Sequence, residues 1–121
     1  MRWLILLLLL FSGCVFNSIT GNIIGSSTDG PYLVINIVDG DTLDLNTTQR
    51  IRLSGINTPE TSDCYYLEAK TKLNELTFGK EVRVESDKDN MDKYGRLLRY
   101  IYVDDLHVNK YLVENGYAKV Y

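Results

Sequence analysis

The chain has 121 residues, a formal net charge of −3 and 24% charged residues. This length allows one small domain and excludes two, and a hydrophobic content of 45% is typical of a globular protein rather than a disordered one. A net negative charge argues against a nonspecific nucleic-acid binder, which is usually basic, so any site for a polyanion has to be local.

The first residues have the features of an export signal. Arg2 precedes an unbroken apolar run from Trp3 to Phe11, which is shorter than the roughly 20 residues of a membrane-spanning helix. We therefore interpret residues 1–13 as a signal peptide. The tripeptide Ser12-Gly13-Cys14 resembles a lipoprotein cleavage site, at which Cys14 becomes the lipidated first residue and anchors the chain to the membrane. Plain secretion and a retained N-terminal anchor are the alternatives.

The next segment and the cysteines set the expected domain boundary. Residues 14–30 are rich in Gly, Ser, Asn and Thr, a composition typical of a flexible tether, and we expect the folded domain over residues 31–121. Lipidation of Cys14 would leave Cys64 without an internal partner, so we expect Cys64 to be a partly buried small side chain rather than a catalytic thiol. A disulfide between the two cysteines is the alternative if Cys14 is not lipidated.

Three short strands are predicted in the first half of the domain. Residues 32–38 form an apolar, β-branched run, and residues 42–46 and 50–56 alternate between apolar and polar side chains. This alternation places Arg50 and Arg52 on the face opposite the core. Short turns between the strands predict an antiparallel meander.

The second half of the domain mixes helical and strand periodicity. Apolar residues at helical spacing predict an amphipathic helix over residues 65–78, and Gly79 is placed to end it. The pattern then predicts a strand over 81–85, a polar loop over 87–95, strands over 97–103 and 106–108, and a short helix capped by Asn109 and closed by Gly116. We expect a mainly β, α+β domain: a five-stranded Greek-key barrel of the OB-fold type with two helices.

Four short motifs carry polar residues that could build a catalytic site. They are DGDT at Asp39–Thr42, Arg52, NTPE at Asn57–Glu60 and DKYGR at Asp92–Arg96. Taken alone, each has a structural interpretation as a turn, a loop or a solvated strand residue. Taken together, two arginines can fork onto phosphate oxygens, and carboxylates from separate loops can hold a hard cation such as Ca²⁺. The combination suits phosphodiester hydrolysis, which needs an aimed water and stabilised phosphoryl charge.

The order and spacing of these motifs resemble the staphylococcal nuclease family, the thermonuclease-like or SNase domains. The resemblance runs from about Val34 to Val120 and includes the tail NKYLVENGYAKVY, which is similar to the family's helix followed by Gly-x-Ala-Lys-Val. It implies an endonuclease that uses Ca²⁺ to hydrolyse DNA and RNA, on single-stranded or frayed substrate, and leaves 3′-phosphorylated products.

The resemblance also implies a role for individual residues. Glu60 is the general base, or orients the attacking water, while Arg52 and Arg96 bind and polarise the scissile phosphate. Lys93 and Tyr94 match positions that contact a terminal phosphate of a bound nucleotide.

The implied metal ligands are Asp41, Asn57 and the backbone carbonyl of Thr58. Asn57 stands where the family has a metal-binding Asp, so one negative charge is lost and we expect weaker Ca²⁺ binding rather than its absence. Two further departures are the short segment between Glu60 and Glu68, without the family's lysine-rich loop, and the lack of a counterpart, beyond Tyr121, to the family's last helix and to an aromatic residue that often touches substrate. We expect lower substrate affinity from both.

Some polar and aromatic residues near the motifs are expected to have structural roles. We expect Asp39 to shape the turn before Gly40, His107 to be a solvent-facing strand residue, and Tyr111 and Tyr117 to pack in the core rather than stack a base.

The leading hypothesis is therefore an exported, membrane-tethered, monomeric nuclease acting on DNA and RNA. One rival is a noncatalytic nucleic-acid-binding module on the same barrel, which would bind without cleaving. A second rival is a structural envelope lipoprotein, in which loss of Glu60 would change little besides stability.

Overall fold

The computed structural model describes residues 27–121. The predicted signal peptide and the predicted lipidation of Cys14 lie outside the described residues. Within residues 27–121, no helix is long and apolar enough to cross a membrane.

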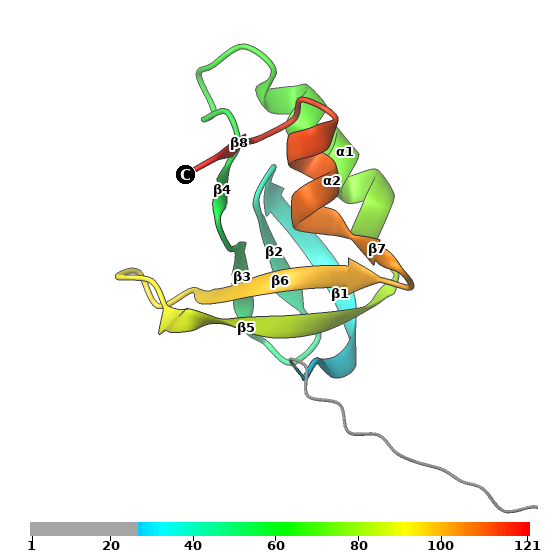
Figure 1. Ribbon diagram of the computed structural model, residues 1–121. Helices are drawn as coiled ribbons and strands as arrows, with labels where there is room; N and C mark the ends of the chain where they lie inside the picture. The colour runs from blue at the N-terminus through cyan, green and yellow to red at the C-terminus, as the bar shows by residue number, and fades with distance from the viewer. Residues whose placement is uncertain (1–26) are drawn as a thin grey trace, which may run out of the picture.

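Five strands close into a barrel (Figure 1). They are β1 (Asp29–Asp39), β2 (Thr42–Leu45), β3 (Arg50–Leu53), β5 (Glu81–Met91) and β6 (Leu97–Val103). The meander β1–β2–β3 is antiparallel, β5 pairs with β1 and β6, and a parallel pairing of β3 with β6 closes the ring. The predicted OB-fold barrel is thus confirmed.

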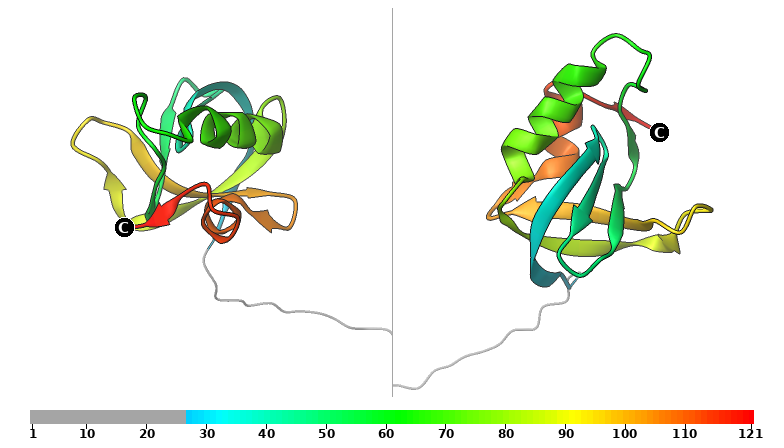
Figure 2. Two further views of the ribbon diagram at one scale, coloured as in Figure 1. Left: turned by 90° about the horizontal axis from the view of Figure 1, so that it is seen from above. Right: turned by 180° about the vertical axis from the view of Figure 1, so that it is seen from behind.

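The remaining elements extend this barrel. Strand β7 (Leu106–His107) forms a hairpin with β6, and β4 (Ile56–Asn57) pairs with β8 (Lys119–Val120) in a separate two-stranded sheet. Helix α1 (Tyr66–Thr77) packs on β1, and α2 (Val108–Glu114) packs on β6. Figure 2 shows the two helices next to each other on one side of the barrel.

Alternation along the strands fills the barrel with aliphatic side chains. Leu43, Leu45, Ile51 and Leu53 are each at most 1% exposed, as their period of two predicts. Burial of four such side chains stabilises the fold by about 1.5–3 kcal/mol each. Gly79 adopts a left-handed conformation (φ 73°) directly after α1, which is how the sequence predicts that the helix ends.

The prediction of a loop over residues 87–95 is wrong for residues 87–91, which belong to β5. Strand β5 continues to Met91, because Met91 pairs with Leu97 after an irregularity that begins at Ser86. The extra residues bulge out, and the guanidinium of Arg99 donates to the backbone oxygen and to Oδ1 of Asn90, at 3.2 and 3.0 Å.

Asn109 does not cap α2, because it lies inside the helix. The cap is His107, whose Nδ1 accepts a long hydrogen bond of 3.5 Å from the Lys110 amide. Asn109 is instead buried, where Oδ1 accepts from the Ile101 amide at 3.0 Å and Nδ2 donates to the Ser54 carbonyl at 2.9 Å. It therefore ties α2 to β6 and to the end of β3.

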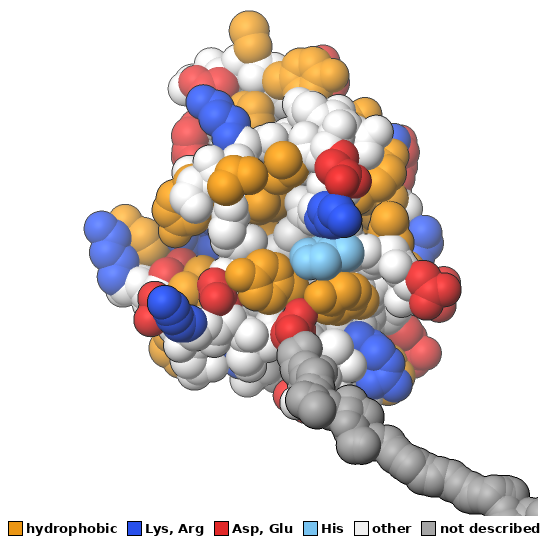
Figure 3. All heavy atoms as spheres, viewed as in Figure 1, with side chains coloured by type: hydrophobic (Ala, Val, Ile, Leu, Met, Phe, Trp, Pro, Cys, Tyr) orange, Lys and Arg blue, Asp and Glu red, His pale blue; other side chains and the backbone are white. Residues whose placement is uncertain are grey.

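Two side chains differ in exposure from the prediction. Cys64 is a free, exposed thiol rather than a partly buried one. His107 is half-buried rather than solvent-facing, and its ring contacts Tyr102 with centroids 4.7 Å apart. Figure 3 shows the imidazole between hydrophobic side chains on this face. Burial lowers the pKa of His107.

Candidate active site

One cavity brings together residues from four separate segments of the chain. It has a volume of about 560 Å³ and is lined by Asp39, Asp41, Arg50, Arg52, Glu60, Tyr94 and Arg96. Five of these are residues that the sequence assigns to the site, namely Asp41, Arg52, Glu60, Tyr94 and Arg96. Lys93, Asn57 and Thr58 are not part of this lining.

The barrel topology explains how the segments meet. The parallel pairing places Arg52 opposite Leu98 near the start of β6, and Arg96 immediately precedes that strand. The β1–β2 turn is attached to β3 by a hydrogen bond of 2.8 Å from the Leu53 amide to the Asp41 carbonyl. The loop after β4 then adds Glu60.

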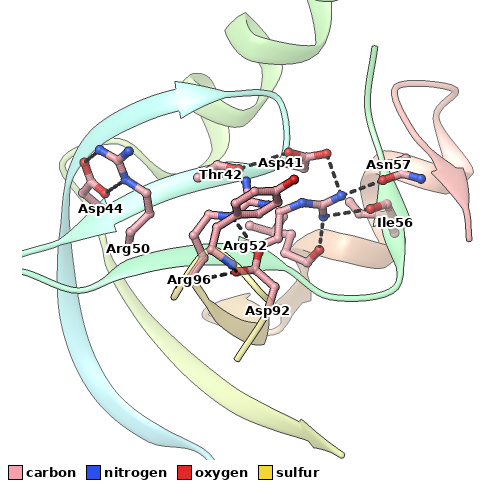
Figure 4. A network of polar contacts seen from close by, with 11 residues as sticks. Asp41, Thr42, Asp44, Arg50, Arg52, Ile56, Asn57, Asp92 and Arg96 are labelled. Atoms are coloured by element: carbon pink, nitrogen blue, oxygen red, sulfur yellow. Dashed lines mark hydrogen bonds and ion pairs between the residues drawn. The ribbon is translucent and has the colours of Figure 1, made fainter. Parts of the chain in front are cut away.

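Arg52 is held by the chain around it (Figure 4). Its Nη1 donates to the carbonyls of Leu53 and Ile56 at 2.6 and 2.8 Å. Its Nη2 donates to Oδ1 of Asn57 at 2.6 Å and lies 3.3 Å from Oδ2 of Asp41. Both terminal nitrogens are therefore engaged, so a phosphate would meet Nε, or would take the place of Asn57 or Asp41.

Asp41 connects the DGDT turn to the NTPE loop. Its carboxylate is buried and accepts from the Thr58 amide at 3.0 Å and from the Thr42 hydroxyl at 3.1 Å. Oδ1 of Asp39 accepts from the Asp41 amide at 3.1 Å, in agreement with its expected role in shaping the turn. Burial, followed by the neighbouring carboxylate of Asp41, raises the pKa of Asp39.

Glu60 is exposed and is positioned by its own loop. The Glu60 amide donates to Oδ2 of Asp63 at 3.0 Å, and the Asp63 amide donates back to the Glu60 carbonyl at 2.8 Å. This reciprocal pair closes a tight turn directly after Pro59. The backbone of Glu60 is therefore held in place where the residue lines the cavity.

Arg96 is held by Asp92 at the tip of the β5–β6 hairpin. Its Nε lies 2.6 Å from Oδ2 of Asp92, whose Oδ1 accepts from the amides of Tyr94 and Arg96, both at 2.9 Å. The pKa of Asp92 is lowered, because these hydrogen bonds outweigh the opposing effect of burial. The Tyr94 ring lies 5.2 Å from the Arg96 guanidinium and 5.2 Å from Nζ of Lys93. Lys93 thus contacts Tyr94 but is not part of the cavity lining.

The family model of the staphylococcal nuclease homologues matches residues 50–121, which include β3, Glu60 and Arg96. The chain belongs to the staphylococcal nuclease family. Among its relatives is the thermonuclease of Staphylococcus intermedius, which is 35% identical over 106 residues that cover 78% of this chain and 63% of the relative.

Two further relatives come from other genera. The micrococcal nuclease of Shigella flexneri is 34% identical over 73% of this chain and 56% of the relative. The endonuclease YncB of Bacillus subtilis is 37% identical over 69% of this chain and 44% of the relative. This member of the family therefore spans less than two thirds of the length of these relatives.

The donor set of this family member suits a hard cation. The cavity lining offers the carboxylates of Asp39, Asp41 and Glu60 and no thiol or imidazole, and Ca²⁺ prefers oxygen ligands. However, no group of three or more His, Cys, Asp or Glu side chains in residues 27–121 is arranged to hold a metal ion. Oδ1 of Asn57 bonds to Arg52. The oxygen donors of the cavity lining fit a hard cation that would be held weakly.

Three residues of the site are absent from the sequence-based prediction. Arg50 lines the cavity and pairs with Asp44 at 2.7 Å, and its position two residues before Arg52 on the same strand is the signal that identifies it. Asp92 and Asp63 position Arg96 and Glu60. Asp92 begins a turn that Gly95 completes, which is a recognisable signal, whereas Asp63 has no comparable sequence signature.

Proposed function

We propose that this chain is a Ca²⁺-dependent endonuclease that hydrolyses phosphodiester bonds of DNA and RNA and leaves 3′-phosphorylated products. One observation carries the proposal: Asp41, Arg52, Glu60 and Arg96, from separate segments, line a single cavity. A carboxylate base and two guanidinium groups are what the hydrolysis of a phosphodiester needs.

Each residue has a distinct task in this reaction. Glu60 takes a proton from the attacking water, whose oxygen forms a bond to phosphorus while the bond from phosphorus to the 5′-oxygen breaks. Arg52 and Arg96 donate hydrogen bonds to the phosphoryl oxygens, where negative charge increases in the transition state. The departing 5′-oxygen takes up a proton, and Arg96 stabilises its charge. A bound Ca²⁺ would neutralise further charge on the phosphate, with Asp41 as its protein ligand.

The test is a cleavage assay of the full chain on single-stranded DNA and RNA, with Ca²⁺ titrated from zero and with EDTA as the negative control. We expect cleavage that depends on Ca²⁺, with 3′-phosphate ends detected by their sensitivity to a 3′-phosphatase. Glu60→Gln and Arg96→Ala should each lower kcat by at least 10²-fold. Glu81→Gln and Arg83→Ala, at exposed positions of β5 outside the cavity, are matched controls.

Binding of nucleic acid without cleavage at any Ca²⁺ concentration would contradict the proposal. That result would favour the noncatalytic binding module. Unchanged behaviour of Glu60→Gln in every assay apart from stability would favour a structural protein instead.

We also propose that the chain acts outside the cytoplasm, tethered to the membrane through lipid on Cys14. The short apolar run after Arg2 and the Ser-Gly-Cys sequence support this location. Expression with radiolabelled palmitate should label the natural chain and the Cys64→Ser variant but not Cys14→Ser. Equal labelling of all three would remove the anchor from the proposal.

A further inference from the structure

A second and larger cavity lies next to the candidate active site. It has a volume of about 720 Å³ and is enclosed by the loop over residues 57–65 and the segment over residues 116–121. The short sheet formed by β4 and β8 joins these two walls, because Ile56 pairs with Val120 and Asn57 with Lys119. Figure 1 shows the loop and β8 beside each other. Cavities that bind small ligands usually measure about 300–1,000 Å³.

The two cavities adjoin at Glu60. Glu60 lines both of them, while Asn57 and Thr58 line only the second. A strand whose scissile phosphate lies against Arg52 and Arg96 therefore has room for a neighbouring nucleotide on the other side of Glu60.

The lining of the second cavity combines tyrosines with one lysine. Tyr65 is 49% exposed and Tyr121 is 73% exposed, so both present ring surface to the solvent. Tyr117 packs against the core, and its ring centroid lies 5.9 Å from that of Tyr65. Lys119 is exposed on β8. Exposed aromatic rings beside a positive charge are the usual platform for unpaired bases.

The acidic residues of the cavity indicate which part of a nucleotide enters it. Glu60 and Asp63 repel phosphate, but a carboxylate accepts hydrogen bonds from the exocyclic amino groups of bases. The base therefore points inward, and the backbone phosphate stays at the rim with Lys119.

We propose that this cavity is a second nucleotide subsite, in which a base next to the scissile phosphate stacks on Tyr65 and Tyr121 while Lys119 contacts the backbone. The subsite rests on the proposed nuclease function and specifies its substrate as single-stranded, because a paired base cannot leave its duplex without a cost in free energy. It would also supply substrate contacts despite the short segment after Glu60.

The first test compares two substrates with the full chain and Ca²⁺. One is an eight-nucleotide single-stranded DNA, and the other is bis(p-nitrophenyl) phosphate, a diester that carries no base. For each substrate we measure kcat/KM, and we compare the value for the oligonucleotide with the value for the diester. Tyr65→Ala and Tyr121→Ala should each lower this ratio by about five-fold or more. The loss should come mainly from a higher KM for the oligonucleotide. Tyr65→Phe and Tyr121→Phe keep the ring and should keep the ratio within two-fold.

The second test measures the salt dependence of binding to the same oligonucleotide in EDTA. Lys119→Met should reduce the slope of log K against log salt by about 0.7, the value for one phosphate contact on a single strand. Lys110→Met, on α2 and outside both cavities, should leave the slope unchanged.

The two proposals fail in different ways. If the natural chain cleaves both substrates and the alanine variants keep its ratio, the subsite is wrong and the nuclease function stands. If the natural chain cleaves nothing, the nuclease function is wrong, and the binding assay alone decides on the subsite. Equal affinity of the natural chain and both alanine variants would then overturn it.

Discussion

Arg52 and a cation would compete for the side-chain oxygen of Asn57. The amide oxygen that the family resemblance assigns to Ca²⁺ accepts a hydrogen bond of 2.6 Å from Arg52, and the same guanidinium nitrogen lies 3.3 Å from Asp41. A cation that used both oxygens would have to displace this nitrogen. The cost of displacing Arg52 is one reason to expect weak binding of a cation. A second reason is that Asn57 is neutral and adds no negative charge to attract the cation.

Asn57→Asp should strengthen the binding of Ca²⁺. The added negative charge should lower the Ca²⁺ concentration at half-maximal cleavage by about tenfold, which corresponds to ~1.4 kcal/mol. Isothermal titration calorimetry of Ca²⁺ with the same variant provides a readout that is independent of cleavage.

Asn57→Ala is the matched control, because it removes the oxygen without adding charge. An unchanged Ca²⁺ requirement in Asn57→Asp would mean that Arg52 neutralises the new carboxylate. That outcome would remove position 57 from the metal site.

Much of the site is predictable at the scale of the residue. The motifs identify Arg52, Glu60 and Arg96, and the structure places all three at one cavity. The hydrogen bond from Arg52 to Asn57 was not predictable, because it depends on side-chain rotamers and on the path of the chain between β3 and β4.

At the scale of the element, the loop between β4 and α1 is a small closed unit. The two reciprocal hydrogen bonds between Glu60 and Asp63 stabilise its turn. The side chain of Asp63 contacts Glu60, the proposed general base, only at its backbone amide, so we expect Asp63 to be a positioning residue.

Asp63→Ala should lower kcat by about tenfold and leave KM within two-fold, since small displacements of a catalytic group have large effects on rate. Asp63→Asn keeps an acceptor oxygen and should restore most of kcat. Steady-state kinetics of both variants provide the measurement. A matching loss of kcat in the two variants would show that the charge of Asp63, rather than its hydrogen bond, matters.

The DGDT turn packs directly on the NTPE loop and on α1. A Cβ added to Gly40 would lie 2.7 Å from the Thr58 hydroxyl oxygen and 2.9 Å from Cβ of Ala69. Only glycine leaves room for these three segments to meet.

Gly40→Ala should therefore destabilise the fold by about 1–3 kcal/mol through overpacking, as measured by urea denaturation. Gly55→Ala is the control, because its Cβ would meet nothing within 4 Å and only its φ of 76° opposes a side chain. We expect a smaller loss there, of about 1 kcal/mol. An equal or smaller effect at Gly40 would contradict the packing argument.

Elements with strong local signals were predicted well. Alternation located the meander, and Gly79 located the end of α1. The sequence did not predict the bulge in β5, because the polar residues there resemble a loop. It did not predict the burial of Asn109 either, because an Asn at that position resembles a helix cap. In the structure Arg99 satisfies Asn90 across the β5–β6 hairpin, while Asn109 bonds to Ile101 and to Ser54, 55 positions away.

At the scale of the whole molecule, carboxylates couple stability to pH. The pKa values of Asp44, Asp87 and Asp92 are lowered, for Asp44 by its hydrogen bond with Arg50 and for Asp87 by its contact with Ser54. A carboxylate with a lowered folded-state pKa stabilises the fold above its unfolded value near 3.8, and this contribution is lost as pH falls through the folded value.

The urea midpoint should accordingly decrease between pH 5 and pH 3. Asp39 has a raised pKa and contributes with the opposite sign, which offsets part of the loss. Asp92→Asn should flatten the pH dependence, since the unfolded state then binds one proton fewer on acidification. A variant curve parallel to that of the natural chain would contradict this assignment.

The parallel pairing of β3 with β6 has a consequence for when the candidate active site can form. Arg52 and Arg96 are 44 positions apart in the sequence and meet only across that pairing. A chain still being made has the meander of β1, β2 and β3, which carries Arg52, before it has Arg96. The proposed phosphodiester cleavage would therefore require the completed barrel.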